Sequence, residues 1–157
     1  MLREVAAHEL GLGEGRLRQV DLFRPIRGVR QAGSDRDKGA LAWLAAATEL
    51  VLPVGSALSH LTAARLLGLP VPSRWMPPDP LDVMNLAAAP KIRRAGCEGH
   101  PGLESRRVIQ RNGLPVVSPQ DTRCDLAATA PGSLNLDLDD FIVPGDAVVH
   151  HRRGISQ

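Results

Sequence analysis

Aromatic residues are almost absent from this chain, which contains no tyrosine, two phenylalanines and two tryptophans among its 157 residues. Aromatic side chains bury the largest areas in most cores, so the core here must be built from leucine, valine and alanine. The hydrophobic fraction of 43% suffices for such a core. The length suits one compact domain, or a very small domain joined to a medium one. Base-stacking platforms for single-stranded nucleic acid are not expected, because they need aromatic rings.

The basic residues are nearly all arginine, since Lys38 and Lys91 are the only lysines. The formal net charge is only +2, so the chain as a whole is not strongly basic. Arginine binds phosphate groups and guanine edges through its planar fork of donors. The arginine bias therefore fits a DNA-binding protein, and it fits equally well a GC-rich genome that encodes arginine in place of lysine.

The two cysteines, Cys97 and Cys124, lie far apart and match no spacing of zinc ligands. We therefore expect free thiols in a reduced, cytoplasmic protein, with no bound metal and no cofactor. Charges from Arg3 and Glu4 onward do not fit a signal peptide. No apolar run reaches the length of about 18 residues that a membrane-spanning helix needs, so no membrane partner is expected.

The first 33 residues are predicted to form two short helices and an extended segment. Residues 2–10 form an amphipathic pattern that ends at Gly11, and residues 14–20 follow as a second helix. Residues 22–30 are predicted to be extended, because Pro25 disfavours a helix. This order of helix, turn, helix and strand is that of the back part of a winged helix-turn-helix. The helix that normally precedes this pair is missing, so we expect residues 1–33 to be a partial winged-helix segment.

The rest of the chain, from 34 to 153, is predicted to be a second domain, with 154–157 as a tail. Residues 31–39 are predicted to be a loop. Glycine, proline and asparagine mark the boundaries of most later elements. The predicted helices cover 40–51, Ser59 to Leu67 with Ser59 as cap and Gly68 as stop, Ser118-Pro119 to about Ala128, and 137–150. The predicted strands cover 81–86, 96–100, 106–111 and 114–117. Pro101-Gly102 is predicted to form a turn, and Asn112-Gly113 a hairpin turn.

Several segments in this order resemble a known family. The segments that carry the resemblance are an arginine-rich start, Gly55-Ser56-Ala57-Leu58-Ser59-His60-Leu61-Thr62-Ala63-Ala64-Arg65-Leu66-Leu67-Gly68-Leu69-Pro70, then Gly113-Leu114-Pro115-Val116-Val117-Ser118-Pro119, Leu138-Asp139-Asp140-Phe141 and Gly145-Asp146-Ala147-Val148-Val149. The set is similar to the front half of actinobacterial proteins related to AbiEi antitoxins, many of which carry a C-terminal Vsr-like endonuclease domain (DUF559). The resemblance implies an α+β fold, with an abbreviated winged helix-turn-helix followed by a small α/β domain with a short antiparallel sheet.

The residues expected to contact double-stranded DNA lie between Arg16 and Arg30, where five arginines accompany one acidic residue, Asp21. Neutralised phosphates release counterions, so such a patch gives salt-dependent binding. A recognition helix presents one group of side chains and the wing presents another. The expected DNA-binding residues are Arg16, Arg18 and Gln19 on the helix and Arg24, Arg27 and Arg30 on the wing. The alternative is a solvated face, or pairing of these arginines with Glu4, Glu9 and Glu14.

No catalytic residues are expected, and the chain is not predicted to be an enzyme. Vsr-like nucleases need an acidic residue two positions before a lysine, whereas Arg36 precedes Lys38 and Ala89 precedes Lys91 at that spacing. Ser59 and His60 are adjacent, so their side chains diverge by about 100° on a helix and do not form a nucleophile–base pair. We expect His60 to play a structural role. A second basic cluster (Lys91, Arg93 and Arg94) is predicted to be mainly a solvated loop.

The resemblance implies a DNA-binding transcriptional regulator of the type IV toxin–antitoxin kind. Antitoxins of that family repress their own operon and oppose a nucleotidyltransferase toxin, so a toxin or nuclease protein is an expected partner. The alternative is the non-catalytic N-terminal half of a Vsr-like endonuclease, inert alone or acting as an adaptor. A small domain without retained activity is a third reading.

Overall fold

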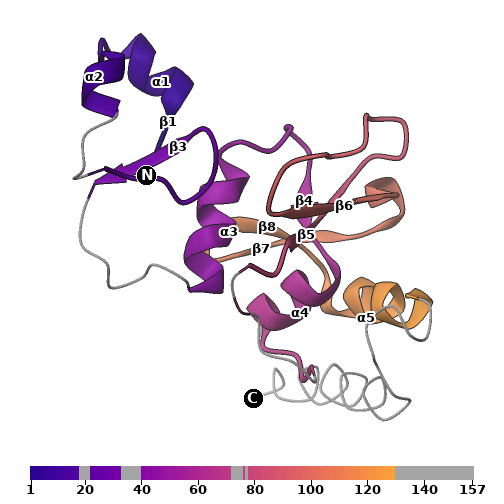
Figure 1. The fold of residues 1–157 in the computed structure, drawn as a ribbon. Coiled ribbons are helices and arrows are strands. Elements are labelled where there is room, and N and C mark those ends of the chain that lie inside the picture. Colours follow the sequence, from indigo (N-terminus) through magenta and orange to yellow (C-terminus); the bar gives the residue numbers. More distant parts are fainter. Residues whose placement is uncertain (18–21, 33–39, 72–75, 77, 130–157) are drawn as a thin grey trace, which may run out of the picture. The chain divides into compact units, whose positions relative to one another are not determined.

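The computed structural model describes residues 1–17, 22–32, 40–71, 76 and 78–129 (Figure 1). The chain divides into two compact units, Met1–Val54 and a second unit that begins at Gly55. The sequence predicted a domain boundary after residue 33, whereas helix α3 (Leu41–Glu49) belongs to the first unit. Its Trp43 explains why, because the indole Nε1 donates to Gln31 Oε1 at 2.7 Å.

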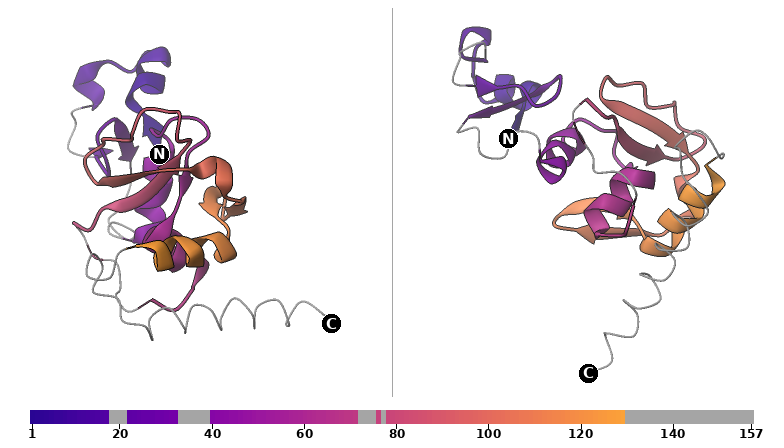
Figure 2. Two further views of the ribbon diagram at one scale, coloured as in Figure 1. Left: turned by 90° about the vertical axis from the view of Figure 1, so that its right-hand side faces the viewer. Right: turned by 60° about the horizontal axis from the view of Figure 1, so that its bottom comes forward.

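The first unit begins with a strand, two short helices and two further strands (Figures 1 and 2). These are β1 (Leu2–Arg3), α1 (Glu4–Glu9), α2 (Glu14–Leu17), β2 (Leu22–Phe23) and β3 (Val29–Ala32). Strand β3 lies in the middle of a three-stranded sheet of order β1-β3-β2, and both of its pairings are antiparallel. Both predicted helices are present, although Leu2 and Arg3 form a strand and residues 18–20 lie outside the described residues.

The predicted extended segment over 22–30 is two strands joined by a turn, so the expectation of one strand was wrong. The Val29 N–H donates to the Ile26 carbonyl at 3.1 Å and closes the turn. Gly28 has φ +91°, a conformation that a glycine adopts at little cost. The chain therefore reverses within the arginine-rich segment and forms a small hairpin there.

The second unit contains a five-stranded sheet of order β6-β5-β4-β8-β7. Its elements are β4 (Ala57–Leu58), α4 (His60–Leu67), β5 (Leu81–Asn85), β6 (Cys97–Pro101), the short 3₁₀ helix η2 (Leu103–Ser105), β7 (Val108–Arg111), β8 (Leu114–Val117) and α5 (Pro119–Ala128). Helix α4 packs on β5 and β8, and α5 packs on α4 (Figures 1 and 2). The mixed α/β composition agrees with the expected α+β class.

The sheet is mixed, so the expectation of a short antiparallel sheet was wrong. Strands β4 and β8 pair in parallel, and so do β5 and β6. Parallel neighbours need a crossover rather than a tight turn, and residues 86–96 supply it between β5 and β6. This crossover packs so closely on β6 that a Cβ added to Gly99 would lie 2.5 Å from the Ile92 carbonyl oxygen. Pro101-Gly102 likewise joins no hairpin, since β6 and β7 lie at opposite edges of the sheet.

Three local predictions in this unit are confirmed. Asn112 and Gly113 both have positive φ, +51° and +78°, as a two-residue hairpin between β7 and β8 requires. Ser118 caps α5, since its Oγ accepts a hydrogen bond from the Asp121 N–H. Gly68 ends α4 in the left-handed conformation at φ +72°. In the first unit, the helix predicted over 40–51 is likewise present, as α3.

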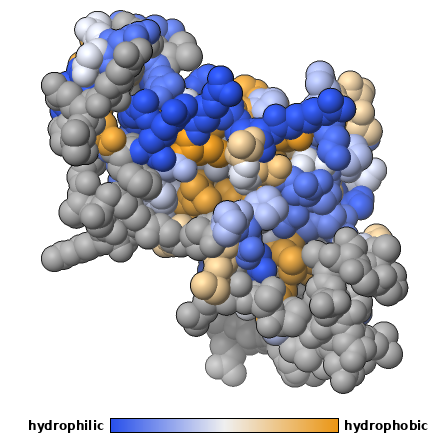
Figure 3. Space-filling view, in the orientation of Figure 1, coloured by the Kyte–Doolittle hydropathy of each residue, from blue (hydrophilic) through white to orange (hydrophobic). Residues whose placement is uncertain are grey.

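Aliphatic and other small side chains form the buried core of the described residues, as the shortage of aromatics required. In the second unit the core includes Leu58, Leu81, Val83, Val116 and Val117, each at most 1% exposed. On the face that Figure 3 shows, the described residues present hydrophilic side chains with hydrophobic ones between them.

Two further expectations concern the end of the chain and the membrane. The helical stretch predicted over 137–150 and the tail at 154–157 lie outside the described residues. Within the described ranges, none of the helices combines the length and the apolar character needed to cross a bilayer.

Candidate functional site

The residues expected to bind DNA lie on α2 and in the β2–β3 hairpin. Arg16 is exposed on α2, and Arg24 and Arg27 are exposed in the turn between the two strands. Arg18 and Gln19 lie outside the described residues. The three exposed arginines therefore belong to two adjacent elements of one small unit.

Arg30 is already engaged within the first unit. Its Nη2 lies 3.1 Å from Glu4 Oε1, and its side chain is only 16% exposed. Register explains the contact, because Arg30 on β3 pairs with Leu2 on β1, two residues before Glu4. Arg30 thus ties β3 to the start of α1, which is the pairing alternative that the sequence left open for these arginines.

A second group of polar side chains surrounds the start of α4 in the second unit, and it centres on Asp82. Ser59 occupies the cap position of α4 but makes no capping hydrogen bond with its side chain. Instead, Asp82 Oδ2 on β5 accepts from the Thr62 N–H at 3.2 Å and from Thr62 Oγ1 at 3.3 Å. Asp82 therefore caps α4 from a neighbouring strand, and its charge also complements the positive end of the helix dipole.

His60 and His100 stack on one another beside Asp82. Their ring centroids are 3.8 Å apart with an interplanar angle of 24°. His100 Nε2 lies 3.0 Å from Asp82 Oδ1. An ionised carboxylate only accepts hydrogen bonds, so His100 Nε2 carries the proton and donates it. His60 Nδ1 contacts Ser59 Oγ at 3.1 Å. His60 Nε2 and His100 Nδ1 are the ring nitrogens that these contacts leave unused.

Strand register brings these residues together. Ala57 on β4 pairs with Met84 on β5, and Met84 pairs with His100 on β6. The row across three strands ends beside His60, which follows β4 by two residues. His60 takes φ +45° there, an uncommon conformation for a residue with a Cβ. Strained backbone of this kind clusters at functional sites.

The stacked pair favours a neutral imidazole at His60. Burial is the main cause that lowers the pKa of His60 below its ordinary value of 6.5, and repulsion from His100 lowers it further. Asp125 and Asp82 act in the opposite direction, and Arg106 adds a smaller repulsion. His60 is therefore uncharged near pH 7, when its unused nitrogen is available for a hydrogen bond.

Arg106 and Asp125 form an ion pair next to the histidines. Arg106 Nε and Nη2 both contact Asp125 Oδ1, at 2.8 Å and 2.7 Å. The hydrogen bond that Arg106 donates to Asp125 raises the pKa of Arg106 above its usual value. Asp125 is 3% exposed, and its other oxygen, Oδ2, is buried without a hydrogen-bond partner in the described structure. Both donors thus use one carboxylate oxygen, which is unlike the usual two-oxygen fork.

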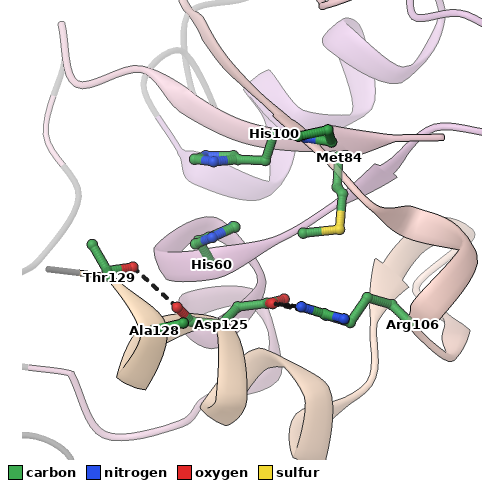
Figure 4. A pocket seen from close by; sticks show the side chains of 8 residues that line it. His60, Met84, His100, Arg106, Asp125, Ala128 and Thr129 are labelled. Carbon is green, nitrogen blue, oxygen red and sulfur yellow. Dashed lines mark hydrogen bonds and ion pairs between the residues drawn. The ribbon is translucent and has the colours of Figure 1, made fainter. Parts of the chain in front are cut away.

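These side chains line a pocket of about 350 Å³ (Figure 4). Its lining residues are His60, Met84, His100, Pro101, Arg106, Asp125, Ala128 and Thr129. In Figure 4 the two imidazoles face one side of the space and the Arg106–Asp125 pair closes another, with the Met84 thioether between them. The pocket combines nitrogen donors with apolar surface, as small-molecule sites do.

A second hollow, of about 330 Å³, lies along the crossover between β5 and β6 and includes the basic cluster Lys91, Arg93 and Arg94. Lys91 and Arg93 are exposed there, as the sequence predicted. The adjoining Cys97 is a weak nucleophile, because burial raises the pKa of its thiol to about 11. Among the described residues, His, Cys, Asp and Glu nowhere form a group of three that could hold a metal ion.

Sequence reasoning missed most of the pocket. It singled out His60 but gave that residue a structural role, and it did not consider Asp82, His100, Arg106 or Asp125 for this site. No local motif marks these residues, since they come from two strands, two helices and the segment that follows η2. A usable signal was the pair of histidines at strand and helix ends in a chain with only five histidines.

Comparison with known proteins does not assign the chain to a family. No protein-family model matches the chain, and no curated protein matches it. The functional conclusion therefore depends on the residues, the geometry and the resemblance described above.

Proposed function

We propose that this protein is a DNA-binding transcriptional regulator of the AbiEi antitoxin type. The topology of the first unit supports this proposal. Its elements follow the order strand, helix, helix, strand and strand, with sheet order β1-β3-β2, and this order is compatible with the second half of a winged helix-turn-helix. In such domains the second helix enters the major groove, and the hairpin after it forms the wing.

The observation that carries the proposal is the position of three exposed arginines. Arg16 lies on α2, and Arg24 and Arg27 lie in the β2–β3 turn; in the proposal, α2 acts as the recognition helix and the turn as the wing tip. Phosphate contacts of this kind fix the orientation of a protein on the duplex, and arginine in the helix reads guanine edges. The Arg30–Glu4 pair narrows the proposed interface to Arg16, Arg18, Gln19, Arg24 and Arg27.

The biological role in the proposal comes from the family resemblance. An antitoxin of this type binds its own promoter and opposes a nucleotidyltransferase toxin. Binding to the upstream DNA and protection from the product of an adjacent nucleotidyltransferase gene are therefore two separate expectations. If the chain is instead the targeting half of a Vsr-like endonuclease, neither expectation holds for the isolated protein.

The test compares two variants that each lose four positive charges. One replaces Arg16, Arg18, Arg24 and Arg27 with alanine. The matched control replaces Lys91, Arg93, Arg111 and Arg123, which are all exposed in the second unit. Fluorescence anisotropy on a duplex from the upstream region should show binding lost in the first variant. The control should lose little more than the general electrostatic attraction.

The opposite ranking would place the interface on the second unit and contradict the proposal. Circular dichroism of both variants separates loss of binding from loss of folding. Arg30→Ala serves as a further check, because it should lower stability through the lost Glu4 contact rather than remove a DNA contact.

A further inference from the structure

We propose that the pocket beside the stacked histidines binds the ammonium group of a small primary amine, with Asp125 Oδ2 as its main acceptor. The polar lining of the pocket comes from separate elements, since His60 begins α4, His100 lies on β6 and Asp125 lies on α5 (Figure 4). The pocket lies wholly in the second unit. The proposal is therefore independent of DNA binding by the first unit.

The observation that carries the proposal is the unpartnered oxygen of Asp125. This side chain is 3% exposed, and its Oδ2 is buried without a hydrogen-bond partner in the described structure. An ionised carboxylate only accepts hydrogen bonds, and a buried acceptor left without a donor is rare and costly. Arg106 Nε and Nη2 both contact Oδ1. Oδ2 is therefore the oxygen that an N–H group of a ligand takes without displacing Arg106.

The two imidazoles add further acceptors to the same pocket. His100 donates through Nε2 to Asp82, so Nδ1 of the neutral ring has a free lone pair. His60 contacts Ser59 Oγ through Nδ1, and its Nε2 accepts whenever Nδ1 carries the proton. A primary ammonium group brings three N–H donors and no acceptor, as the lysine side chain does. Its donors match a lining whose unused atoms are mainly acceptors.

The charges around the pocket also favour a cation over an anion. Asp82 and Asp125 carry two negative charges against the single positive charge of Arg106, and both acids are held close to the histidines. Burial, followed by repulsion from His100, lowers the pKa of His60, so His60 adds no positive charge near pH 7. Arg106 is already paired with Asp125. With neutral imidazoles the local balance is therefore negative.

The size and the walls of the pocket limit the organic part of the ligand. A volume of about 350 Å³ is close to the lower end of ligand sites, which span roughly 300–1,000 Å³. Met84, Pro101 and Ala128 supply apolar surface beside the polar groups. A short alkyl chain on the ammonium group gains contact with this surface. The pocket therefore suits a small alkylamine.

Proton binding by His60 should compete with the amine. The charged groups that face His60 are Asp125, Asp82 and Arg106, together with the His100 ring. A protonated His60 would repel an ammonium group and would lose its acceptor lone pair. Affinity should therefore fall as the pH is lowered from about 7.5 to about 5.5, because binding then requires release of a proton. In the complex, the titration midpoint of His60 should move to lower pH.

The experiment is a titration of the protein with n-butylammonium chloride, followed by NMR of the histidine ring protons at constant ionic strength. Tetramethylammonium chloride is the control that keeps the charge but has no N–H donor, and 1-butanol keeps the chain but has no charge. The expected result is saturable shifts of the His60 and His100 signals with n-butylammonium alone. Equal responses to the two cations would contradict the proposal, because they would reflect charge without hydrogen bonding.

Three variants test the assignment to Asp125. Asp125→Asn should weaken amine binding about tenfold or more, since it removes a charged acceptor. Glu98→Gln removes a negative charge at an exposed position outside the pocket and should leave the affinity unchanged. Arg106→Gln keeps an N–H donor beside Asp125 and removes the positive charge. Binding of n-butylammonium should therefore become tighter in Arg106→Gln, whereas an anion would bind less tightly.

The proposal fails if the folded wild-type protein shows no saturable shifts, or if folded Asp125→Asn binds n-butylammonium as tightly as the wild type. Circular dichroism establishes the folding of each variant. If Asp125→Asn does not fold, Arg106→Gln decides instead, because weaker binding in that variant would overturn the proposal.

Discussion

The imidazoles of His60 and His100 stack at 3.8 Å and join the start of α4 to strand β6. Asp82 Oδ1 accepts a hydrogen bond from His100 Nε2, and Asp82 Oδ2 accepts one from the Thr62 N–H and so caps α4. One carboxylate on β5 thus connects a helix, two strands and the wall of the pocket.

Stability should fall on acidification through His60. The pKa of His60 is lowered in the folded state, so the folded protein binds fewer protons than the unfolded chain. This stabilising contribution is fully present well above the ordinary value of 6.5 and is lost as the pH falls from 6.5 through the folded pKa. The slope contributed by one proton approaches about 1.4 kcal/mol per pH unit. Urea denaturation of wild type and His60→Asn across this range measures the difference, which should shrink at low pH; parallel curves would exclude the effect.

The positive φ of His60 should make this position sensitive to side-chain shape. His60→Val should be about 1–2 kcal/mol less stable than His60→Asn, because β-branched residues tolerate the left-handed region poorly while asparagine adopts it. Both variants lose the ring stack, so the comparison isolates the backbone. Chemical denaturation of the two proteins is sufficient. Equal stabilities would show that the backbone at residue 60 relaxes without cost.

Asp82 should contribute more to α4 than the residue at its cap position. Asp82→Ala should cost about 2 kcal/mol, since it removes a charged acceptor of the Thr62 N–H and a partner of His100. Ser59→Ala should cost only about 0.5–1 kcal/mol, because the Ser59 hydroxyl makes no capping hydrogen bond. Thermal melting curves of the two variants show which substitution lowers the stability more. A larger loss for Ser59→Ala would mean that the capping role belongs to serine.

Gly99 should not accept a side chain. Gly99→Ala should destabilise the second unit by about 1–3 kcal/mol, because the new Cβ would meet the backbone oxygen of Ile92 at 2.5 Å. Gly13→Ala is a suitable control, since nothing lies within 4 Å of its added Cβ and its φ is not positive. Thermal unfolding followed by circular dichroism compares the two. If Gly99→Ala leaves the stability unchanged, the crossover over β6 can shift at little cost to accommodate a side chain.

The sequence predicted well those features that neighbouring residues determine. Asn112-Gly113 sets a hairpin, Ser118-Pro119 starts a helix and Gly68 ends one, because each depends on local backbone preferences. The mixed sheet and the pocket depend on strand order, which no local pattern reveals. Asp82, which lies on β5, caps α4 in place of Ser59, the residue that the sequence predicted for this role. Arg30 was expected on the DNA surface, and its contact with Glu4 depends on the pairing of β1 with β3.

The central claim is sequence-dependent DNA binding through the first unit, and a salt series tests it most directly. Anisotropy of the purified protein is measured on its upstream duplex and on a scrambled duplex of equal length. We expect tighter binding to the upstream duplex, and a plot of log affinity against log salt concentration with a slope of about −0.9 for each phosphate contacted. Absence of binding at low salt by a protein shown to be folded, or equal affinity for both duplexes, would contradict it.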